Sequence, residues 1–290
     1  MSGDSSTGDF VGIPTKDEVF DAPIINEPPT QPEPITLPER PDGRAPVSVT
    51  RVAHSSVLID FDGTLILTDP WFTETDEYHH GEALAMGVGQ LPRLAAVVAS
   101  HAHYDHYDIE NFARYAHLDV PLLVGAFDEM TDRARAAGFT DVRAVGPGQT
   151  EVVDGVSITA LPGAHVVQEI TFAFSAGSTT IYFGADTLVT PEVRGIAERG
   201  PYDVVLLPVN GLRVGGDPAV SSAEEAALFA GMLQARVAIP IHYRFYGGPK
   251  TDEHLLAYNG NPYRFLNSLR RLAPDTVGCV LEPGAKQTFI

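Results

Sequence analysis

Apolar and β-branched residues recur in short segments after Val47, some alternating with polar residues and others forming continuous apolar runs. Alternation with a period of two is typical of half-buried strands, whereas a short continuous run is typical of a strand buried on both faces. Asp62-Gly63 and Asp154-Gly155 each separate two such segments, and this dipeptide is a strong signal for a two-residue hairpin turn. The predicted strands are 47–52, 56–61, 64–68, 94–99, 121–124, 141–145, 150–153, 156–161, 171–175, 179–183, 204–207, 236–241, 278–281 and 287–289.

Helical segments separate many of these strands. In the segment 221–233, Ser221 or Ser222 can cap the first turn, and Glu224 or Glu225 can return a hydrogen bond three residues later. Hairpin-rich stretches with strand and helix repeats between them indicate two sheets covered by helices, a four-layer α/β sandwich over residues 46–290. The irregular segment 73–90 within it is typical of a lid or binding loop. The predicted helices are 108–116, 127–137, 190–199, 221–233 and 263–273.

Residues 1–45 differ from the rest of the chain, because prolines are frequent and the charges are mainly acidic. Proline removes a backbone donor and disfavours helix in the residue before it. We therefore predict an N-terminal arm that is disordered or loosely draped. Short apolar clusters at 10–13 and 23–25 could instead dock on the body or on a second subunit.

Composition and charge limit the classes of molecule that this protein is expected to bind. A chain of 290 residues that is 44% hydrophobic is long enough for a sizeable core. The formal net charge is -19, from 19 basic and 38 acidic residues, and we find no basic cluster long enough to form a binding groove. Such a charge repels phosphate backbones and anionic lipid, so we expect no nucleic-acid partner and disfavour a membrane.

Two further features bear on the compartment. No apolar stretch approaches the roughly twenty residues of a membrane span, and the acidic N-terminus does not resemble a secretory signal. Cys279 is the single cysteine and lies in an apolar run, which is typical of a buried structural thiol. A lone cysteine forms no intramolecular disulfide, so we expect a cytoplasmic protein.

Metal-ligand side chains are concentrated in the stretch 100–106, which reads Ser-His-Ala-His-Tyr-Asp-His and follows the predicted strand 94–99. Imidazole and carboxylate are the donors that borderline divalent metals prefer, and a tight turn at a strand end lets them converge. The alternative is a histidine-rich surface loop. His165, Asp186 and His242 also follow predicted strands closely. Each alone is an ordinary strand-end residue, but together they indicate ligands on one rim of the sandwich.

The chain thereby resembles the metallo-β-lactamase fold superfamily, which implies a four-layer αββα sandwich of the metallo-β-lactamase type. It is similar in particular to the branch typified by ascorbate-phosphate lactonase and the N-acyl phosphatidylethanolamine phospholipase D. The resemblance covers residues 47–290 and leaves the arm unexplained. It rests on His101-x-His103-x-Asp105-His106, on His165, Asp186 and His242, and on the opening segment 54–59 that runs to Asp69-Pro70.

The resemblance implies two cations at this rim. Zinc is the default ion, and manganese or iron would suit the same donors. Zinc β-lactamases of the commonest type have a cysteine in the second site, and Cys279 is not at a matching position. Flavodiiron reductases replace one loop histidine with glutamate, and this loop keeps all its histidines, which favours hydrolysis over redox chemistry. In this scheme His101, His103 and His165 hold one cation, Asp105, His106 and His242 hold the other, and Asp186 bridges the two.

The reaction implied is attack by a hydroxide shared between the two cations, whose parent water has a pKa lowered from 15.7 towards about 7. Asp105, Asp186 and His242 are the predicted catalytic residues. The expected substrate is a small molecule with an ester-type bond, either a lactone or carboxylic ester or a phosphodiester.

Further residues are predicted around the cations. Asp69 and Thr187 are expected to orient the ligand loops by hydrogen bonds, with ordinary turn residues as the alternative. Arg244 could hold a substrate carboxylate or phosphate in a two-pronged contact, with a surface role as the alternative. The predicted substrate-binding residues are His54, Trp71, His79, His80, Tyr243 and Arg244.

Two readings from other classes remain open at this point. One is an accessory protein that keeps the metal site and presents the acidic arm to a partner. The other is a phospholipase at a membrane surface, for which 71–72 and 245–246 would form an apolar lip. A homo-oligomer is compatible with each of these readings.

Overall fold

Two seven-stranded sheets form the centre of the molecule. The structure, a computed structural model, describes residues 19–37, 46–248, 252 and 254–290. The first sheet has the order β19 (Lys286–Phe289), β2 (Val47–Ala53), β3 (Ser56–Phe61), β4 (Thr64–Thr68), β6 (Ala96–Ala99), β7 (Leu122–Gly125) and β8 (Val142–Val145). The second has the order β18 (Val277–Gly278), β16 (Val237–Ile241), β13 (Val204–Pro208), β12 (Thr179–Phe183), β11 (Ile170–Ala176), β10 (Val156–Pro162) and β9 (Thr150–Val153).

Both predicted hairpins are confirmed. β3 and β4 pair around Asp62 and Gly63, whose φ angles are 49° and 97°. β9 and β10 pair around Asp154 and Gly155, whose φ angles are 46° and 82°. A two-residue turn of type I′ requires positive φ at both central positions, and Asp-Gly is among the few dipeptides that adopt it readily.

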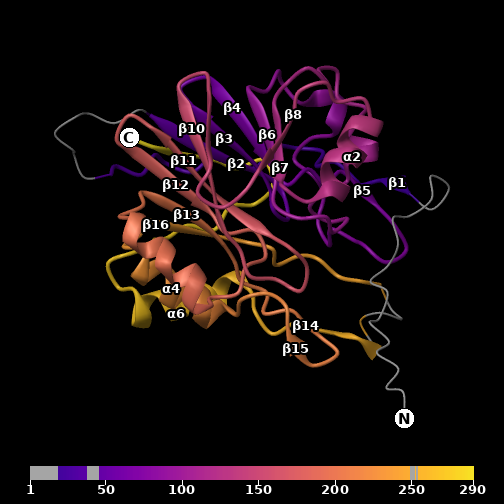
Figure 1. The fold of residues 1–290 in the computed structure, drawn as a ribbon. Helices are drawn as coiled ribbons and strands as arrows, with labels where there is room; N and C mark the ends of the chain where they lie inside the picture. The colour runs from indigo at the N-terminus through magenta and orange to yellow at the C-terminus, as the bar shows by residue number, and fades with distance from the viewer. Residues whose placement is uncertain (1–18, 38–45, 249–251, 253) are drawn as a thin grey trace, which may run out of the picture.

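Helices cover the outer face of each sheet, so the predicted four-layer sandwich is confirmed (Figure 1). Within β13, Val204 and Leu206 pack between the sheets, whereas Val205 and Leu207 pack against the helices. Burial on both faces explains why the central strands are continuous apolar runs. The first sheet is covered by α1 (Ile109–Phe112) and α2 (Asp128–Ala136), and the second by α3 (Pro191–Arg194), α4 (Ala223–Met232) and α6 (Pro262–Leu272).

The helix α4 begins with the predicted capping box. Ser222 Oγ accepts a hydrogen bond from the Glu225 backbone N–H at 3.2 Å, and the Glu225 carboxylate accepts one from the Ser222 N–H at 2.9 Å. Two backbone donors that the first helical turn cannot satisfy are thereby paired.

Several predicted elements are shorter than expected. Only 109–112 of the predicted helix 108–116 is helical, and 190–199 divides into α3 and the 3-10 helix Gly195–Arg199. The segment 73–90 is irregular apart from β5 (Thr73–Glu74) and the 3-10 helix Val88–Gln90. A small sheet of β14 (Arg213–Val214), β15 (Asp217–Pro218) and β17 (Leu256–Ala257) was not predicted, because two-residue strands carry no periodic pattern.

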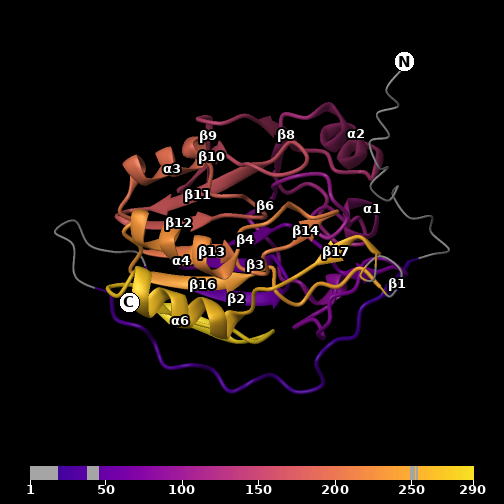
Figure 2. The same ribbon diagram turned by 90° about the horizontal axis from the view of Figure 1, so that it is seen from below.

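The described part of the N-terminal arm, residues 19–37, runs along the outside of the body (Figure 2). Its strand β1 (Phe20–Asp21) pairs with β5, and Ile24 forms a bridge with Leu84. Near the other end, Ile35 forms a parallel bridge with Phe289 of the edge strand β19. The apolar cluster at 23–25 therefore docks on the body, whereas the cluster at 10–13 lies outside the described residues.

Among the described residues, no helix combines the length and the apolar character that crossing a membrane requires. The cytoplasmic location stays a prediction.

Candidate metal centre

The predicted ligands follow strands of both sheets and meet at one edge of the sandwich. His165, Asp186 and His242 come shortly after β10, β12 and β16 of the second sheet. The loop 101–106 follows β6 of the first sheet, whose neighbour β4 runs parallel to it. Because these strands share one direction within each sheet, their carboxyl ends lie together. The structure brings all seven predicted ligands into two adjoining groups.

The first group consists of His101, His103, His165 and Asp186, whose donor atoms lie within 4.8 Å of one another. His103 Nδ1 lies 3.1 Å from His101 Nε2 and 3.1 Å from His165 Nε2. Asp186 Oδ2 lies 3.8 Å from His165 Nε2. Donors placed about 2.0–2.2 Å from one cation are separated by such distances, so this group fits a metal site.

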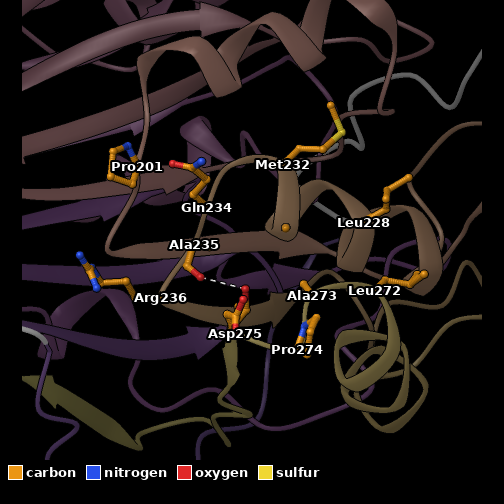
Figure 3. A pocket seen from close by; sticks show the side chains of 12 residues that line it. Pro201, Leu228, Met232, Gln234, Ala235, Arg236, Leu272, Ala273, Pro274 and Asp275 are labelled. Carbon is orange, nitrogen blue, oxygen red and sulfur yellow. Dashed lines mark hydrogen bonds between the residues drawn. The ribbon is translucent and has the colours of Figure 1, made fainter.

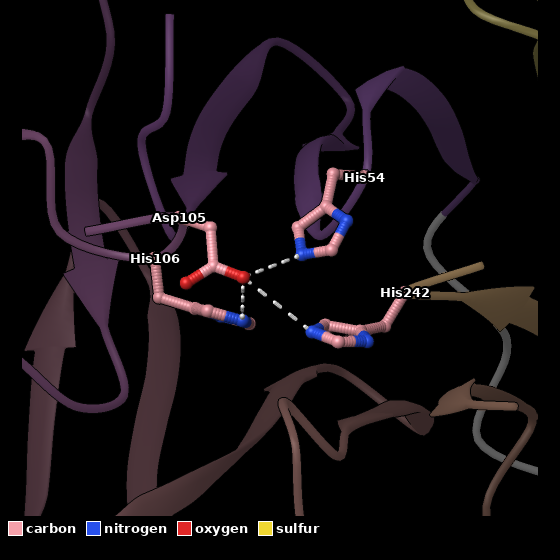
Figure 4. A group of neighbouring side chains, drawn as sticks. All are labelled: His54, Asp105, His106 and His242. Carbon is pink, nitrogen blue, oxygen red and sulfur yellow. Dashed lines mark ion pairs between the residues drawn. The ribbon is translucent and has the colours of Figure 1, made fainter. Parts of the chain in front are cut away.

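The second group consists of His54, Asp105, His106 and His242 (Figure 4). Asp105 Oδ2 lies 3.7 Å from His106 Nε2, 3.7 Å from His242 Nε2 and 3.4 Å from His54 Nε2. Asp186 Oδ1 reaches the same group, at 3.1 Å from His106 Nε2 and 3.0 Å from His242 Nε2. Asp186 therefore contacts imidazoles of both groups, as the bridging scheme requires.

Several buried polar atoms at this centre fit the binding of cations. Asp186 Oδ1, His106 Nε2 and both ring nitrogens of His242 are buried, and apart from the ion pairs of Asp186 Oδ1 with the two imidazoles no described residue forms a hydrogen bond with them. Leaving a buried polar atom without a hydrogen bond costs roughly 1–3 kcal/mol, and cations bound by these atoms would offset that cost. The imidazole and carboxylate donors also suit zinc, manganese and iron. The residues present thus fit the cations that the sequence predicts.

Asp69 forms hydrogen bonds beside the second group, in the orienting role expected of it. Its carboxylate accepts hydrogen bonds from the backbone N–H of Ser100 at 2.8 Å and from Ser100 Oγ at 2.7 Å. The same carboxylate contacts His106 Nδ1 at 2.6 Å. A carboxylate at Nδ1 fixes the imidazole so that Nε2 faces the cluster, which is how such partners orient metal-binding histidines.

Thr187 joins two ligand loops, which also agrees with the prediction. Its Oγ1 accepts a hydrogen bond from the Ala164 N–H at 2.9 Å, and its backbone oxygen accepts one from Ser221 Oγ at 2.6 Å. Next to it, His165 Nδ1 lies 2.7 Å from the Ala219 carbonyl, which orients that ring. The positions of His165 and Asp186 are thereby coupled to the start of α4.

Glu169 is a supporting residue that sequence reasoning missed. Its buried carboxylate accepts a hydrogen bond from the Asp186 backbone N–H at 2.9 Å and lies 3.5 Å from His101 Nδ1. A Cβ at Gly163 would lie 2.7 Å from Glu169 Oε1, so this approach requires glycine there. No spacing signal singles out Glu169, because it precedes β11 rather than ending a strand.

His106 and His242 differ from the imidazoles of the first group in the direction of their pKa shifts, whereas burial lowers the pKa of His54 well below its usual value. Burial lowers the pKa of His101 and His165 and brings that of His103 to about 4. Burial opposes the charged form of His106 and His242 too, but Asp186 together with Asp105 raises the pKa of both. A cation entering the second group must therefore displace protons, whereas the imidazoles of the first group are already neutral at neutral pH.

The pKa values of Asp105 and Asp186 are shifted by the same interactions. Burial opposes ionisation of Asp105 and Asp186, but the neighbouring His106 and His242 hold the pKa of both carboxyl groups well below the usual range. Both carboxylates are therefore ionised and available as donors at neutral pH.

Backbone strain is concentrated around this centre. Four residues here have a positive φ angle, in a region that residues other than glycine rarely adopt: His54 (50°), Asp69 (37°), Ala185 (46°) and His242 (54°). Each lies at or beside a residue that faces the cluster. Such conformations cost roughly 1–3 kcal/mol each and persist where the surrounding contacts impose them.

Three of the six predicted substrate-binding residues are buried, so the structure gives them no surface for contact with substrate. His54, Trp71 and His80 have no exposed surface. The Trp71 ring stacks on His80 with centroids 3.5 Å apart and meets the edge of His54 at 5.1 Å. These three side chains are packed in the interior beside the ligand loops and do not face a surface that substrate could reach. With Trp71 and Phe72 buried, the apolar lip predicted at 71–72 does not form at the surface.

The other three predicted substrate-binding residues, His79, Tyr243 and Arg244, lie nearer the surface. The contacts described for their side chains are with residues outside the two ligand groups. The His79 ring stacks on Tyr246 at 4.6 Å. The Tyr243 hydroxyl donates a hydrogen bond to the Leu281 carbonyl at 3.2 Å. Arg244 is half exposed, and its Nε lies 3.9 Å from Glu82, so a carboxylate of the protein already lies beside it. Their contact with substrate stays a prediction.

Replacing Trp71 with alanine is expected to lower the free energy of unfolding by about 3–5 kcal/mol, because a fully buried indole is lost. The KM of folded Trp71→Ala for a small ester should change little, since the ring has no surface to offer. Urea unfolding and steady-state kinetics measure the two effects. Tyr263→Ala, at a side chain that is 72% exposed, is the control and should stay within about 0.5 kcal/mol. Unchanged stability with a raised KM would restore the substrate role.

A surface hollow is lined by residues of α4, the end of α6 and the loops beside them, none of which belongs to the metal centre (Figure 3). Leu228, Met232 and Leu272 form its apolar part, and Arg236 and Asp275 are the charged residues of its lining. Arg236 Nε lies 3.4 Å from Asp203, so its charge is compensated. The lining contains no histidine, and the predicted chemistry stays at the strand ends.

Residues 48–242 match the family model described as the beta-lactamase superfamily domain. The chain therefore belongs to the β-lactamase superfamily, and its sandwich is the metallo-β-lactamase fold. The more specific branch, that of the lactonase and the phospholipase, stays a prediction.

Among curated relatives, an uncharacterized protein of Mycobacterium tuberculosis is 29% identical over 224 residues, which are 68% of this chain and 58% of that protein. The chain thus spans little more than half the length of this mycobacterial relative. A UPF0173 metal-dependent hydrolase of Geobacillus sp. is 26% identical over 249 residues, which are 82% of this chain and 98% of that protein. Among solved structures, the metallo hydrolase Igni18 of Ignicoccus hospitalis superposes with a TM-score of 0.65 at 23% identity, covering 84% of this chain and 99% of that one.

Proposed function

We propose that this protein is a metal-dependent hydrolase with two divalent cations that cleaves an ester-type bond in a small molecule. The observation that carries the proposal is the position of Asp186, 3.0–3.8 Å from imidazoles of two separate donor groups. The description of a similar Geobacillus protein as a metal-dependent hydrolase supports the reaction class. A lactone or carboxylic ester and a phosphodiester are the substrates to test first, because the sequence resembles a branch that handles such bonds.

The residues have separate tasks in this proposal. His101, His103 and His165 would hold one cation, Asp105, His106 and His242 the other, and Asp186 would contact both. Bound there, the cations would polarise a scissile carbonyl or phosphoryl oxygen and lower the pKa of a water molecule so that it can attack at neutral pH. Zinc is the first ion to test, followed by manganese and iron.

The protein's own groups prepare the site. Asp69, at 2.6 Å from His106 Nδ1, keeps the opposite nitrogen of that ring directed at the cluster. Glu169 holds the Asp186 backbone through its N–H at 2.9 Å. The rings of Trp71 and Phe245 flank His54 at 5.1 and 6.0 Å, and this apolar surface excludes water from one side of the second group. These contacts fix the donors before a cation or substrate arrives.

The test combines metal analysis with a substrate panel. The purified protein is stripped with a chelator, reloaded with one metal at a time, and assayed on a lactone, a nitrophenyl ester and a bis-nitrophenyl phosphodiester. We expect turnover only after reloading and its loss in His103→Ala. His117→Ala is the matched control, because His117 lies at the surface and contacts Arg93 at 2.9 Å. Hydrolysis that survives in metal-free protein or in His103→Ala would contradict the proposal.

Acidification is expected to remove the two cations in sequence. An imidazole must be neutral to bind a metal. His106 and His242, with raised pKa values, take up protons at a higher pH than His103, whose pKa is about 4. The second group should therefore lose its cation first as the pH falls, and the first group later. Metal content after dialysis at stepped pH measures both losses.

A variant shows which group of ligands loses its cation in each of the two steps. His103→Ala, which weakens the first group, should retain the loss at higher pH and lack the one at lower pH. Loss of both cations in a single step, or loss of the first group's cation at the higher pH, would contradict the assignment.

A further inference from the structure

We propose that His54 is a direct donor to the second cation, through Nε2, so that each cation is held by three imidazoles. The inference rests on the proposed two-cation centre. It differs from the prediction made from sequence, which placed His54 against substrate. The donor sets would then be His101, His103 and His165 for one cation and His54, His106, His242 and Asp105 for the other, with Asp186 contacting both.

The position of the ring carries the first part of the argument. His54 Nε2 lies 3.4 Å from Asp105 Oδ2, and one donor atom of each residue in the group lies within 4.8 Å of the others. The His54 ring centroid is 4.1 Å from that of His242 and 5.3 Å from that of His106. In Figure 4 the His54 ring turns a nitrogen towards the Asp105 carboxylate, as the rings of His106 and His242 do. Three imidazoles thus approach one carboxylate.

The polar atoms of His54 need an explanation. The side chain is fully buried, and neither Nδ1 nor Nε2 forms a hydrogen bond with any residue that the structure describes. A buried polar group in that state costs roughly 1–3 kcal/mol. A packing role would be served at lower cost by an apolar side chain, and a substrate role requires exposed surface. A cation at Nε2 accounts for both the burial and the direction of the ring.

The backbone holds this ring in place. His54 has a φ of 50°, and its N–H donates a hydrogen bond to Glu82 Oε1 at 3.2 Å. Glu82 is in turn paired with the buried Arg51, whose Nη1 lies 3.1 Å from Glu82 Oε2. The edge of the ring meets Trp71. A strained conformation that is fixed by a buried ion pair and an aromatic contact is the form that preorganised ligand residues take.

Metal binding by the second group is the direct test. His54→Ala should weaken the binding of the second cation by more than about 100-fold, beyond the 10–100-fold that loss of an orienting partner costs. The metal content of protein prepared with limiting zinc should then fall from two ions per chain to one. The visible spectrum of the cobalt-loaded protein should lose the contribution of the second site. His117→Ala serves as the control and should keep two ions.

A second variant and a second measurement guard against misfolding. His54→Gln keeps much of the side-chain volume and should show the same loss, with the fold checked by circular dichroism. If neither variant folds, proton NMR of the cobalt-loaded wild type counts the bound imidazoles, where six support the proposal and five overturn it.

Two further results overturn the inference and leave the proposed function standing. One is retention of two ions by the His54 variants with unchanged affinity. The other is weaker binding with an unchanged cobalt spectrum, which would make His54 an orienting residue. A wild type that hydrolyses no ester and binds no cation pair removes the proposed function itself, so the two failures are distinguishable.

Discussion

Asp186→Asn is expected to lower ester hydrolysis by more than about 100-fold and to reduce the content of both metals. Asp186 is the carboxylate that contacts both donor groups, with Oδ1 3.0 Å from His242 Nε2 and Oδ2 3.8 Å from His165 Nε2. The amide of asparagine keeps the size of the side chain but removes the charge. A change at a residue that merely orients a ligand costs 10–100-fold, and a residue between two cations should exceed that range.

Metal content by elemental analysis and turnover under saturating metal measure this effect. The fold should be retained, because Glu169 accepts its hydrogen bond from the backbone of residue 186 rather than from the side chain. Asp119→Asn is a matched control, since Asp119 forms an exposed pair with Arg93. Full metal content and near-normal turnover in Asp186→Asn would remove the bridging role on which the proposed function depends.

Arg51→Ala is expected to lower the free energy of unfolding by about 3–5 kcal/mol. Arg51 is fully buried, it pairs with Glu82, and its Nη1 donates to the Leu281 carbonyl at 3.2 Å. Removing Arg51 leaves the largely buried carboxylate of Glu82 with only the half-exposed Arg244, 3.9 Å away, beside it, and breaking a buried pair by removing one partner is costly. Because Glu82 also accepts the His54 N–H, metal affinity of the second group should fall as well.

Urea unfolding measures the loss, and the exposed pair of Arg93 and Asp119 provides the comparison. Arg93→Ala should cost less than about 1 kcal/mol, because water screens that pair. The double variant Arg51→Met with Glu82→Leu should recover much of the stability, since an apolar pair leaves no buried charge. A loss in Arg51→Ala no larger than that in Arg93→Ala would show that this ion pair does not stabilise the fold.

The main elements of the fold could be predicted from local signals in the sequence. The Asp-Gly dipeptides at 62–63 and 154–155 define two hairpins, because few other residues adopt positive φ at both positions. Continuous apolar runs gave the central strands, since those strands are buried on both faces. The two-residue strands β14, β15 and β17 were missed, because their pairing depends on long-range contacts and leaves no periodic pattern.

The candidate site was predictable only in part. Residues such as His165 and Asp186 could be found because residues that follow parallel strands lie at the same edge of the sheet. Glu169 could not be found this way, since its importance comes from Gly163 allowing its carboxylate to approach. Trp71 and His80 were placed against substrate, although they stack on each other in the interior. Proximity in sequence to ligand loops does not distinguish residues that support a site from residues that line it.

The docked arm has a consequence for self-association. β19 lies at an edge of the first sheet, and an uncovered edge presents free N–H and C=O groups that can pair with another chain. In this protein the Ile35 N–H donates to the Thr288 carbonyl at 2.9 Å, and the Lys286 N–H donates to Gln31 Oε1 at 2.7 Å. The arm thus occupies the positions through which a neighbouring molecule would add a strand. Shortening the chain to begin at Val47 would open that edge and favour aggregation.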